Sequence, residues 1–416
     1  MRRSRVYRSM RWRRQLWRMQ RLWRGSRSAG AVRATLRLSM LPPAPFTVPT
    51  GSDALGPYRT RHLFALARRT LDWPFPLPPH LAQDYARVRG QLAETMRQDR
   101  VGFLAALALP TIGGALGGGD LATAMPQLLL ELARRNILDE RGIFWGAPVA
   151  RLVSPFLGVS RVYGRPKVGM LFQSGRVTES PTDEWVLAET TPDGSFVALE
   201  HGGWLCMADT NPLAMQEAHP GKSGNKLDLG DTDIDSWVKC INDARARTAL
   251  YGPQLAGEHS GILAGIVPVG TDADVSLSAS YREAIGVAYL SLHPSSLTMT
   301  EAIVHETQHS KANLLSWSDP LVTNSGESYP SPVRPDPRPL WGVLLAVHAF
   351  LPVALIHRGM CQAGDPLYEP QRHREVLAIN HDGMQIIRAH AKPTALGRVV
   401  IDGMDALEAA LWSEQA

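Results

Sequence analysis

The stretch TEAIVHETQHSKANLL, residues 300–315, carries two histidines and a glutamate at a spacing that suits metal chemistry. On an α-helix, His305 and His309 lie one turn apart on the same face, so both imidazoles can reach one ion. Glu306 is offset from His305 by about 100° around the helix axis, close enough to touch a metal-bound water. We predict a divalent-metal site here. The competing interpretation is a pair of core histidines satisfied by hydrogen bonds.

A catalytic metal needs at least one further ligand from another segment. Downstream, the helical candidates are His348 and His357 in LWGVLLAVHAFLPVALIHRG, and Glu327 lies in the intervening loop. We favour His348, because an imidazole among apolar residues in the middle of a helix needs a partner. The alternative is that His348 is an ordinary buried histidine.

The loop between these two helices, SYPSPVRPDPRPL, places Arg334, Asp336 and Arg338 among prolines. Prolines stiffen a segment and reduce the entropy that it loses on becoming ordered. Two arginines on a stiff loop near a metal suit bidentate binding of a carboxylate. The alternative is a proline-rich connector whose arginines pair with surface acids.

The elements that must position these residues are mainly helical. The pattern predicts a helix over about 296–317 around the motif, another that starts near Leu340, and more helix from His373 onward. Residues 58–138 also have helical periodicity, with Asp120 as an N-cap. Within them, residues 101–119 are predicted to form a buried helix that ends in a glycine loop.

Short β-branched and aromatic runs between residues 143 and 207 predict strands, including a hairpin around the turn at residues 191–194. We therefore expect a helix-rich α+β fold. Its helices would surround a small mixed or antiparallel sheet, with the HExxH motif on a central helix. We divide the chain into a basic, disordered tail and linker (1–57), a helical N-terminal part (58–142) and an α+β catalytic part with the metal site (143–416).

The net charge of +5 belongs to the tail, because residues 1–39 hold thirteen arginines and no lysine or acid. Without them the charge of the remainder is about −8. An apolar stripe flanked by arginines in the tail could bind an anionic membrane surface or a nucleic acid. We expect instead a solvated arm, or an upstream extension of the reading frame before Met40, and no nucleic-acid partner.

The three cysteines, Cys206, Cys240 and Cys361, are far apart and show no metal-binding spacing. This usage is typical of reduced thiols in a cytoplasmic protein. The apolar run 101–119 is interrupted by Pro110, and the run 342–356 is short, so we predict no membrane span.

The segment EAIVHETQHSKANLL, followed by YPSPVRPDPRPLWGVL, resembles the HEXXH-motif peptide-modification family of bacteria. The resemblance is specific over about residues 285–350 and weaker from about 100 to 400. The family loop usually reads Pro-Trp-Arg, and this chain has Val333 at the middle position.

The resemblance implies an iron- and α-ketoglutarate-dependent β-hydroxylase of a ribosomally made precursor peptide. His305, His309 and His348 would then hold Fe(II). The distal carboxylate of α-ketoglutarate would bind at Arg334 or Arg338, with Asp336 in the same cofactor-binding loop. Glu306 would orient a ligand or water. Partners would be the precursor peptide and other peptide-modifying enzymes.

Two other functions remain open from the sequence. In a zinc metallopeptidase, Zn(II) would replace iron, Glu306 would be the general base and Arg338 would stabilise the oxyanion. The other is a peptide-binding module with a degenerate site, and the intact motif argues against it.

Overall fold

The computed structural model describes residues 51–216, 224–270 and 276–413. These residues belong to one compact unit, Pro43–Ala416. The predictions made for residues 1–50, including the basic tail, lie outside the described residues.

Five helices open the described chain. They are α3 (Gly51–Leu71), α4 (Pro79–Gln98), α5 (Arg100–Leu107), α6 (Pro110–Gly118) and α7 (Leu121–Arg134). Asp120 caps α7 by accepting a hydrogen bond from the backbone N–H of Thr123, as predicted. Residues 51–57 are helical rather than linker. The run 101–119 forms two helices, and its glycines at 113 and 114 lie inside α6 instead of a loop.

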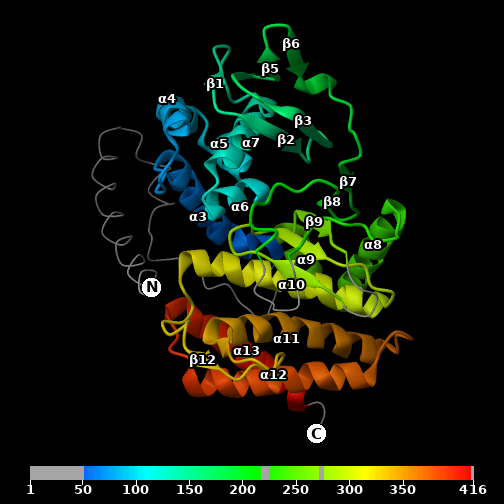
Figure 1. The fold of residues 1–416 in the computed structure, drawn as a ribbon. Helices are drawn as coiled ribbons and strands as arrows, with labels where there is room; N and C mark the ends of the chain where they lie inside the picture. Colours follow the sequence, from blue (N-terminus) through cyan, green and yellow to red (C-terminus); the bar gives the residue numbers. More distant parts are fainter. Residues whose placement is uncertain (1–50, 217–223, 271–275, 414–416) are drawn as a thin grey trace. The chain divides into compact units, whose positions relative to one another are not determined.

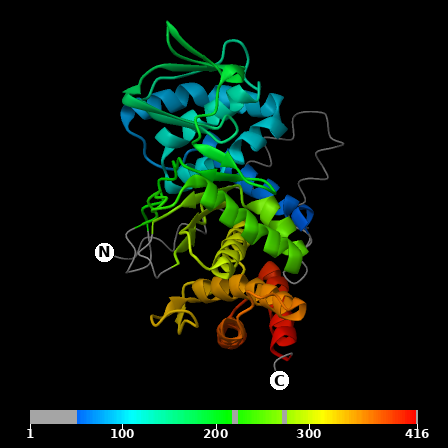
Figure 2. The same cartoon turned by 90° about the vertical axis from the view of Figure 1, so that its right-hand side faces the viewer.

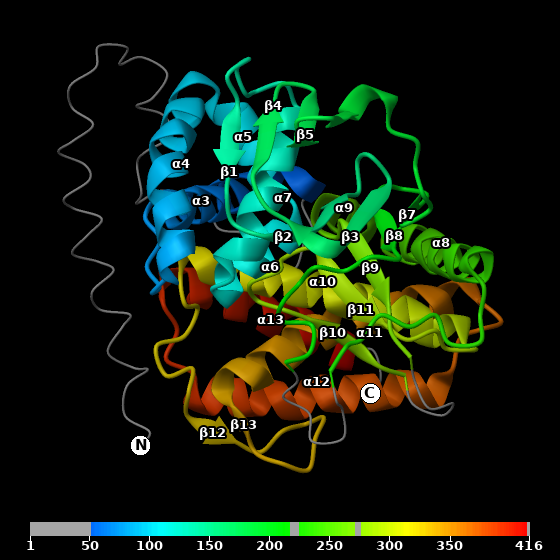
Figure 3. The same cartoon turned by 45° about the horizontal axis from the view of Figure 1, so that its top comes forward.

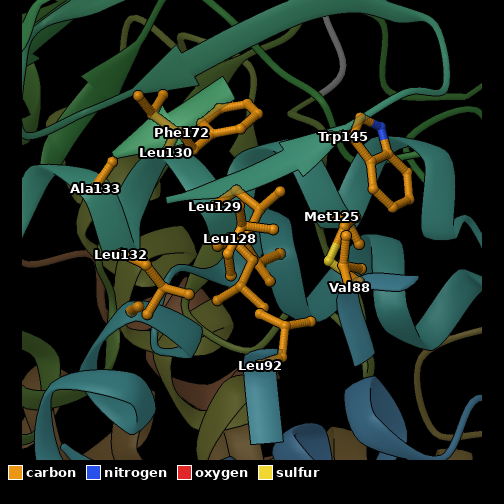
Figure 4. Packing of buried hydrophobic residues seen from close by; sticks show 14 of the residues in the cluster. Val88, Leu92, Met125, Leu128, Leu129, Leu130, Leu132, Ala133, Trp145 and Phe172 are labelled. Carbon is orange, nitrogen blue, oxygen red and sulfur yellow. The ribbon is translucent and has the colours of Figure 1, made fainter. Parts of the chain in front are cut away.

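Helix α7 is the centre of the first hydrophobic core. It packs against α4, α5 and the strands that follow, and Figure 4 shows the leucines of α7 between Leu92 of α4 and the aromatic side chains Trp145 and Phe172. Both aromatic side chains are fully buried. The strands are β1 (Ile143–Trp145), β2 (Val149–Ser154), β3 (Val159–Lys167), β4 (Met170–Gln173), β5 (Arg176–Ser180) and β6 (Asp183–Val186). They form an antiparallel sheet in the order β1-β4-β5-β6 and a separate β2-β3 pair.

The predicted hairpin around residues 191–194 is wrong. Strand β6 pairs with β5, whereas the next strand, β7 (Phe196–Ala198), pairs with β8 (Trp204–Cys206) in a different sheet. The turn signal is genuine, because Gly194 has a φ of 81°. Asp193 uses its carboxylate to accept hydrogen bonds from the N–H groups of Ser160 and Ser195, so the turn docks on β3 instead of joining two paired strands.

A mixed five-stranded sheet forms the second core. Its order is β10-β11-β9-β8-β7, where β9 is Gly265–Pro268, β10 is Ser278–Ser280 and β11 is Val287–Leu290 (Figure 3). Strands β8, β9 and β11 are parallel. Alternate residues of β9 and β11 belong to different clusters, so both faces of the sheet are buried. Helices α8 (Ile234–Tyr251) and α10 (Ser296–Ser318) cover one face.

Helix α10 lies between the two halves of the structure. The helices α11 (Leu340–Ala363), α12 (Pro370–His390) and α13 (Ala395–Ser413) lie on one side of it, and α4 to α7 lie on the other (Figures 1 and 2). The remaining elements are α9 (Pro253–Ile262), the short strands β12 (Ser328–Tyr329) and β13 (Arg338–Pro339), and a 3-10 turn, Leu187–Glu189. Antiparallel pairing of β12 with β13 closes the loop before α11.

The predicted helix-rich α+β fold is confirmed, with the HExxH motif on the central helix α10. By length and composition, α11 could span a bilayer, but 72% of its most apolar window is buried inside the structure. The bent pair α5–α6 also passes this test. A mostly buried apolar helix such as α11 is typical of the core of a soluble protein.

One buried histidine, His62, makes the stability of the folded chain depend on pH. Burial, and then the charge of Arg69, lower the pKa of His62 to about 4. In the unfolded chain this imidazole binds a proton near pH 6.5, and in the folded chain only near pH 4. The contribution of neutral His62 to stability is therefore fully present above pH 6.5 and is lost as the pH falls. At pH 5 the protonation of His62 in the unfolded chain should lower the free energy of unfolding by about 2 kcal/mol.

We therefore expect the variant His62→Phe, which keeps the ring contact with Trp317, to lose less stability than the natural chain between pH 7 and pH 5. Urea unfolding at the two pH values measures the difference. Equal losses in the two proteins would show that His62 is protonated at pH 5 in the folded state.

Candidate metal centre

Helix α10 brings the three motif residues together. A nitrogen from each of His305 and His309 and a carboxylate oxygen of Glu306 lie within 4.8 Å of one another. The helix begins at Ser296, where the Ser295 hydroxyl caps it by accepting from the N–H of Thr298, and it runs without a break to Ser318. The i, i+4 spacing then places both imidazoles on one face, with ring centroids 4.2 Å apart.

The facing helix α11 restrains this face. Phe350 contacts the ring of His305 edge-on, with centroids 4.6 Å apart. Both histidines remain partly exposed, whereas Glu306 is buried at 1% exposure. On the α11 side the ring of His305 therefore packs against an aromatic side chain, which limits the number of orientations open to His305.

Both histidines are neutral at pH 7, as metal ligands must be. Burial, and then the neighbouring His309, lower the pKa of His305 to about 3. Burial lowers the pKa of His309 to about 4. A lone pair on each ring is thus available without the release of a proton.

The donor atoms also fit a divalent cation. Glu306 Oε2 and His309 Nδ1 are buried and have no hydrogen-bond partner among the described residues. A buried polar atom without a partner costs about 1–3 kcal/mol. A cation with nitrogen and oxygen ligands would satisfy the pair, so the residues present fit the metal that the motif predicts.

His348 lies on α11 and is fully buried, but it is not part of the group of atoms within 4.8 Å. Burial, followed by the nearby Lys311 and His309, lowers its pKa well below the ordinary value. The structure therefore places His348 in the neighbourhood of His309 as a neutral imidazole. Its role as third ligand stays a prediction.

Among the described residues, the two arginines of the loop before α11 have other partners than His305 and His309. Arg334 pairs with Asp336 at 3.0 Å, and Arg338 belongs to β13, with its side chain against Gly342 at the start of α11. The contact of Phe350 with His305 marks the level of the metal group on α11. Phe350 lies ten residues after Leu340, so this level is about 15 Å along the helix axis from the end of α11 that the loop reaches. Binding of a carboxylate by this loop stays a prediction.

The two other candidate ligands of the sequence analysis have different partners. Glu327 accepts hydrogen bonds from Asn324 and Tyr329. His357 is fully buried on α11, and its Nε2 lies 2.6 Å from Glu301 on α10. Neither residue belongs to the group around His305.

Sequence reasoning missed a polar network one turn before His305. Arg372 on α12 donates to both carboxylate oxygens of Glu301, from Nε to Oε1 at 3.1 Å and from Nη2 to Oε2 at 2.7 Å, and His357 shares that carboxylate. The ring of His373 stacks on that of His357 at 5.2 Å. The only available signal was that Glu301 precedes His305 by four residues and so shares its helix face.

A second buried network supports the opposite side of α10. Lys311 donates to Glu258 Oε1 at 2.5 Å, and Gln308 donates to Glu258 Oε2 at 2.8 Å. Lys311 and Glu258 are 1% and 2% exposed. This ion pair links the motif helix to α9, and so fixes the rotation of α10 that turns His305 and His309 toward α11.

Comparison of the chain with protein-family models and with curated proteins finds no match.

Proposed function

We propose that this chain is an Fe(II)- and α-ketoglutarate-dependent hydroxylase that acts on a residue of a ribosomally made peptide. The observation that carries the proposal is the group of two neutral imidazoles and one buried carboxylate within 4.8 Å on α10. The choice of iron and of a keto-acid cosubstrate is supported by the resemblance of residues 285–350 to the peptide-modifying family. A cytoplasmic location, the precursor peptide and other peptide-modifying enzymes as partners belong to the same proposal.

Each named residue has a part in this function. His305 and His309 would hold the metal from α10, and His348 would complete the set from α11. Arg334 or Arg338, beside Asp336, holds the distal carboxylate of the cosubstrate. Glu306 accepts a hydrogen bond from a metal-bound water or ligand and orients it. The metal supplies activation of dioxygen, and the balance is peptide C–H plus α-ketoglutarate plus O₂ giving peptide C–OH, succinate and CO₂.

One observation favours a second candidate, a zinc metallopeptidase. Glu306 Oε2 is buried without a partner among the described residues and lies beside both histidines. A carboxylate in this position can accept a proton from a metal-bound water, which is what a peptidase general base does.

Conversion of α-ketoglutarate to succinate in the absence of peptide tests the proposal. We expect slow succinate formation by the Fe(II)-loaded natural chain in air and at least a hundredfold less with His309→Ala. Glu306→Gln should retain much of this reaction, because a glutamine can still orient a water. A fully metal-loaded chain that forms no succinate would contradict the proposal. Zinc-dependent cleavage of a peptide library that is lost in Glu306→Gln would establish the peptidase instead.

A further inference from the structure

A cavity of about 190 Å³ lies where α8, α9 and the turn at residues 201–203 meet. Its lining residues include His201, Arg245, Ala249, His259 and Ser260. Sites for drug-sized ligands are usually about 300–1,000 Å³, so this cavity suits a molecule of a few heavy atoms. The turn that forms one wall is unusual, since His201, Gly202 and Gly203 all have positive φ, which is uncommon for a residue other than glycine.

Arg245 is a buried cation that has no counter-charge among the residues that the structure describes. It is 3% exposed, and no carboxylate pairs with it among the described residues. Its Nη1 donates to the carbonyl oxygens of Glu200 and Gly202, at 2.9 and 2.6 Å, which hold the guanidinium in place. Its Nε is buried and has no hydrogen-bond partner within the described part of the chain. Burial lowers the pKa of Arg245 to about 10.

The free side of this guanidinium matches a carboxylate. Nε and Nη2 form one edge of the planar group, and that edge binds the two oxygens of a carboxylate through parallel hydrogen bonds. A buried charge without a partner is costly, and an anion in the adjacent cavity removes most of that cost.

His259 adds a hydrogen-bond acceptor to the same wall. Its Nδ1 lies 2.9 Å from the hydroxyl oxygen of Thr307. That hydroxyl already donates its proton to the carbonyl oxygen of Ile303, so it accepts from His259 Nδ1–H. In this neutral tautomer Nε2 carries a lone pair, and Nε2 is buried without a partner in the part of the chain that the structure describes. A ligand that binds at His259 Nε2 must therefore supply a donor group.

We propose that this cavity is a binding site for a small 2-hydroxy carboxylate, whose carboxylate pairs with Arg245 and whose hydroxyl donates to His259 Nε2. A 2-keto acid lacks the donor and would leave the His259 lone pair unsatisfied, so it should bind more weakly. The site is distinct from the candidate metal centre, because Thr307 is rotated by about 200° from His305 around α10. The proposal does not depend on the activity proposed above.

Calorimetric titration with lactate, and with pyruvate as the matched acid that lacks the hydroxyl proton, tests the proposal. The chain is kept in EDTA so that no metal can chelate either acid. We expect saturable, one-to-one binding of lactate, and binding of pyruvate that is at least tenfold weaker. Absence of saturable lactate binding, or equal affinity for the two acids, would overturn the proposal.

Two neighbouring positions on α8 provide the variants. Ala249→Leu fills the cavity and leaves Arg245 and His259 in place, so it should weaken lactate binding at least tenfold. Leu250→Ala changes a side chain that is 70% exposed and not part of the lining, so it should not affect binding. Circular dichroism confirms that both variants fold. Equal lactate affinity in Ala249→Leu and Leu250→Ala would place the binding elsewhere and refute the site.

Discussion

Replacing Lys311 with methionine is expected to lower the free energy of unfolding by about 3–5 kcal/mol. Lys311 and Glu258 form an ion pair that is almost completely buried between α10 and α9. Removing the ammonium leaves the Glu258 carboxylate without its counter-charge in a region that water does not reach. Burial of an unpaired charge is costly, because the carboxylate loses its hydration and gains no partner in exchange. Urea unfolding of the metal-free chain measures the effect.

The double variant Lys311→Met with Glu258→Gln should recover most of the lost stability. The amide is neutral, and it can still accept the hydrogen bond that Gln308 donates to Glu258. The matched control is Lys239→Met, which breaks the exposed pair of Lys239 with Asp243 on α8. Exposed pairs contribute little, so we expect a change below about 1 kcal/mol. Similar effects of Lys311→Met and Lys239→Met would show that water reaches the α10–α9 pair.

The second large effect concerns the metal. A divalent cation at a hundred times its dissociation constant should raise the free energy of unfolding of the natural chain by about 2.7 kcal/mol, because it binds the folded state. His309→Ala removes one of the two imidazoles of the group and should abolish this gain. His80→Ala, at an exposed position of α4, should leave it intact. Thermal unfolding with Co(II) and with EDTA gives both values.

Loss of the gain in His309→Ala but not in His80→Ala would assign the metal to α10. An equal gain in all three proteins would mean that the cation binds elsewhere, and the assignment of His305 and His309 as ligands would then be wrong.

The motif helix was predictable because its signals are local. The serine before Ser296 is an N-cap, the apolar spacing over residues 300–315 is helical, and the predicted end at residue 317 differs from the observed end by one residue. The juxtaposition of His305, Glu306 and His309 follows from helix geometry alone. No knowledge of the rest of the fold was needed.

The surroundings of the motif were not predictable, because they come from distant segments. Glu301 meets His357 and Arg372 across 56 and 71 residues, and Glu258 meets Lys311 across 53. In the sequence the four charged residues among them look like ordinary charges on helices, and His357 is recognisable only as a candidate ligand. The same limit explains the wrong hairpin, since turn chemistry at residues 191–194 specifies a bend but not the strand with which each arm pairs.

The most direct test of the central claim is the absorbance of the chain after anaerobic addition of Fe(II) and α-ketoglutarate. If the group on α10 holds iron as a keto-acid-dependent centre, we expect the weak charge-transfer band of a chelated keto acid, and its loss in the double variant His305→Ala, His309→Ala. A second comparison, with Arg334→Ala and Arg338→Ala, shows whether the loop holds the cosubstrate. Stoichiometric zinc binding at α10 with no such band would contradict the hydroxylase and leave the metallopeptidase.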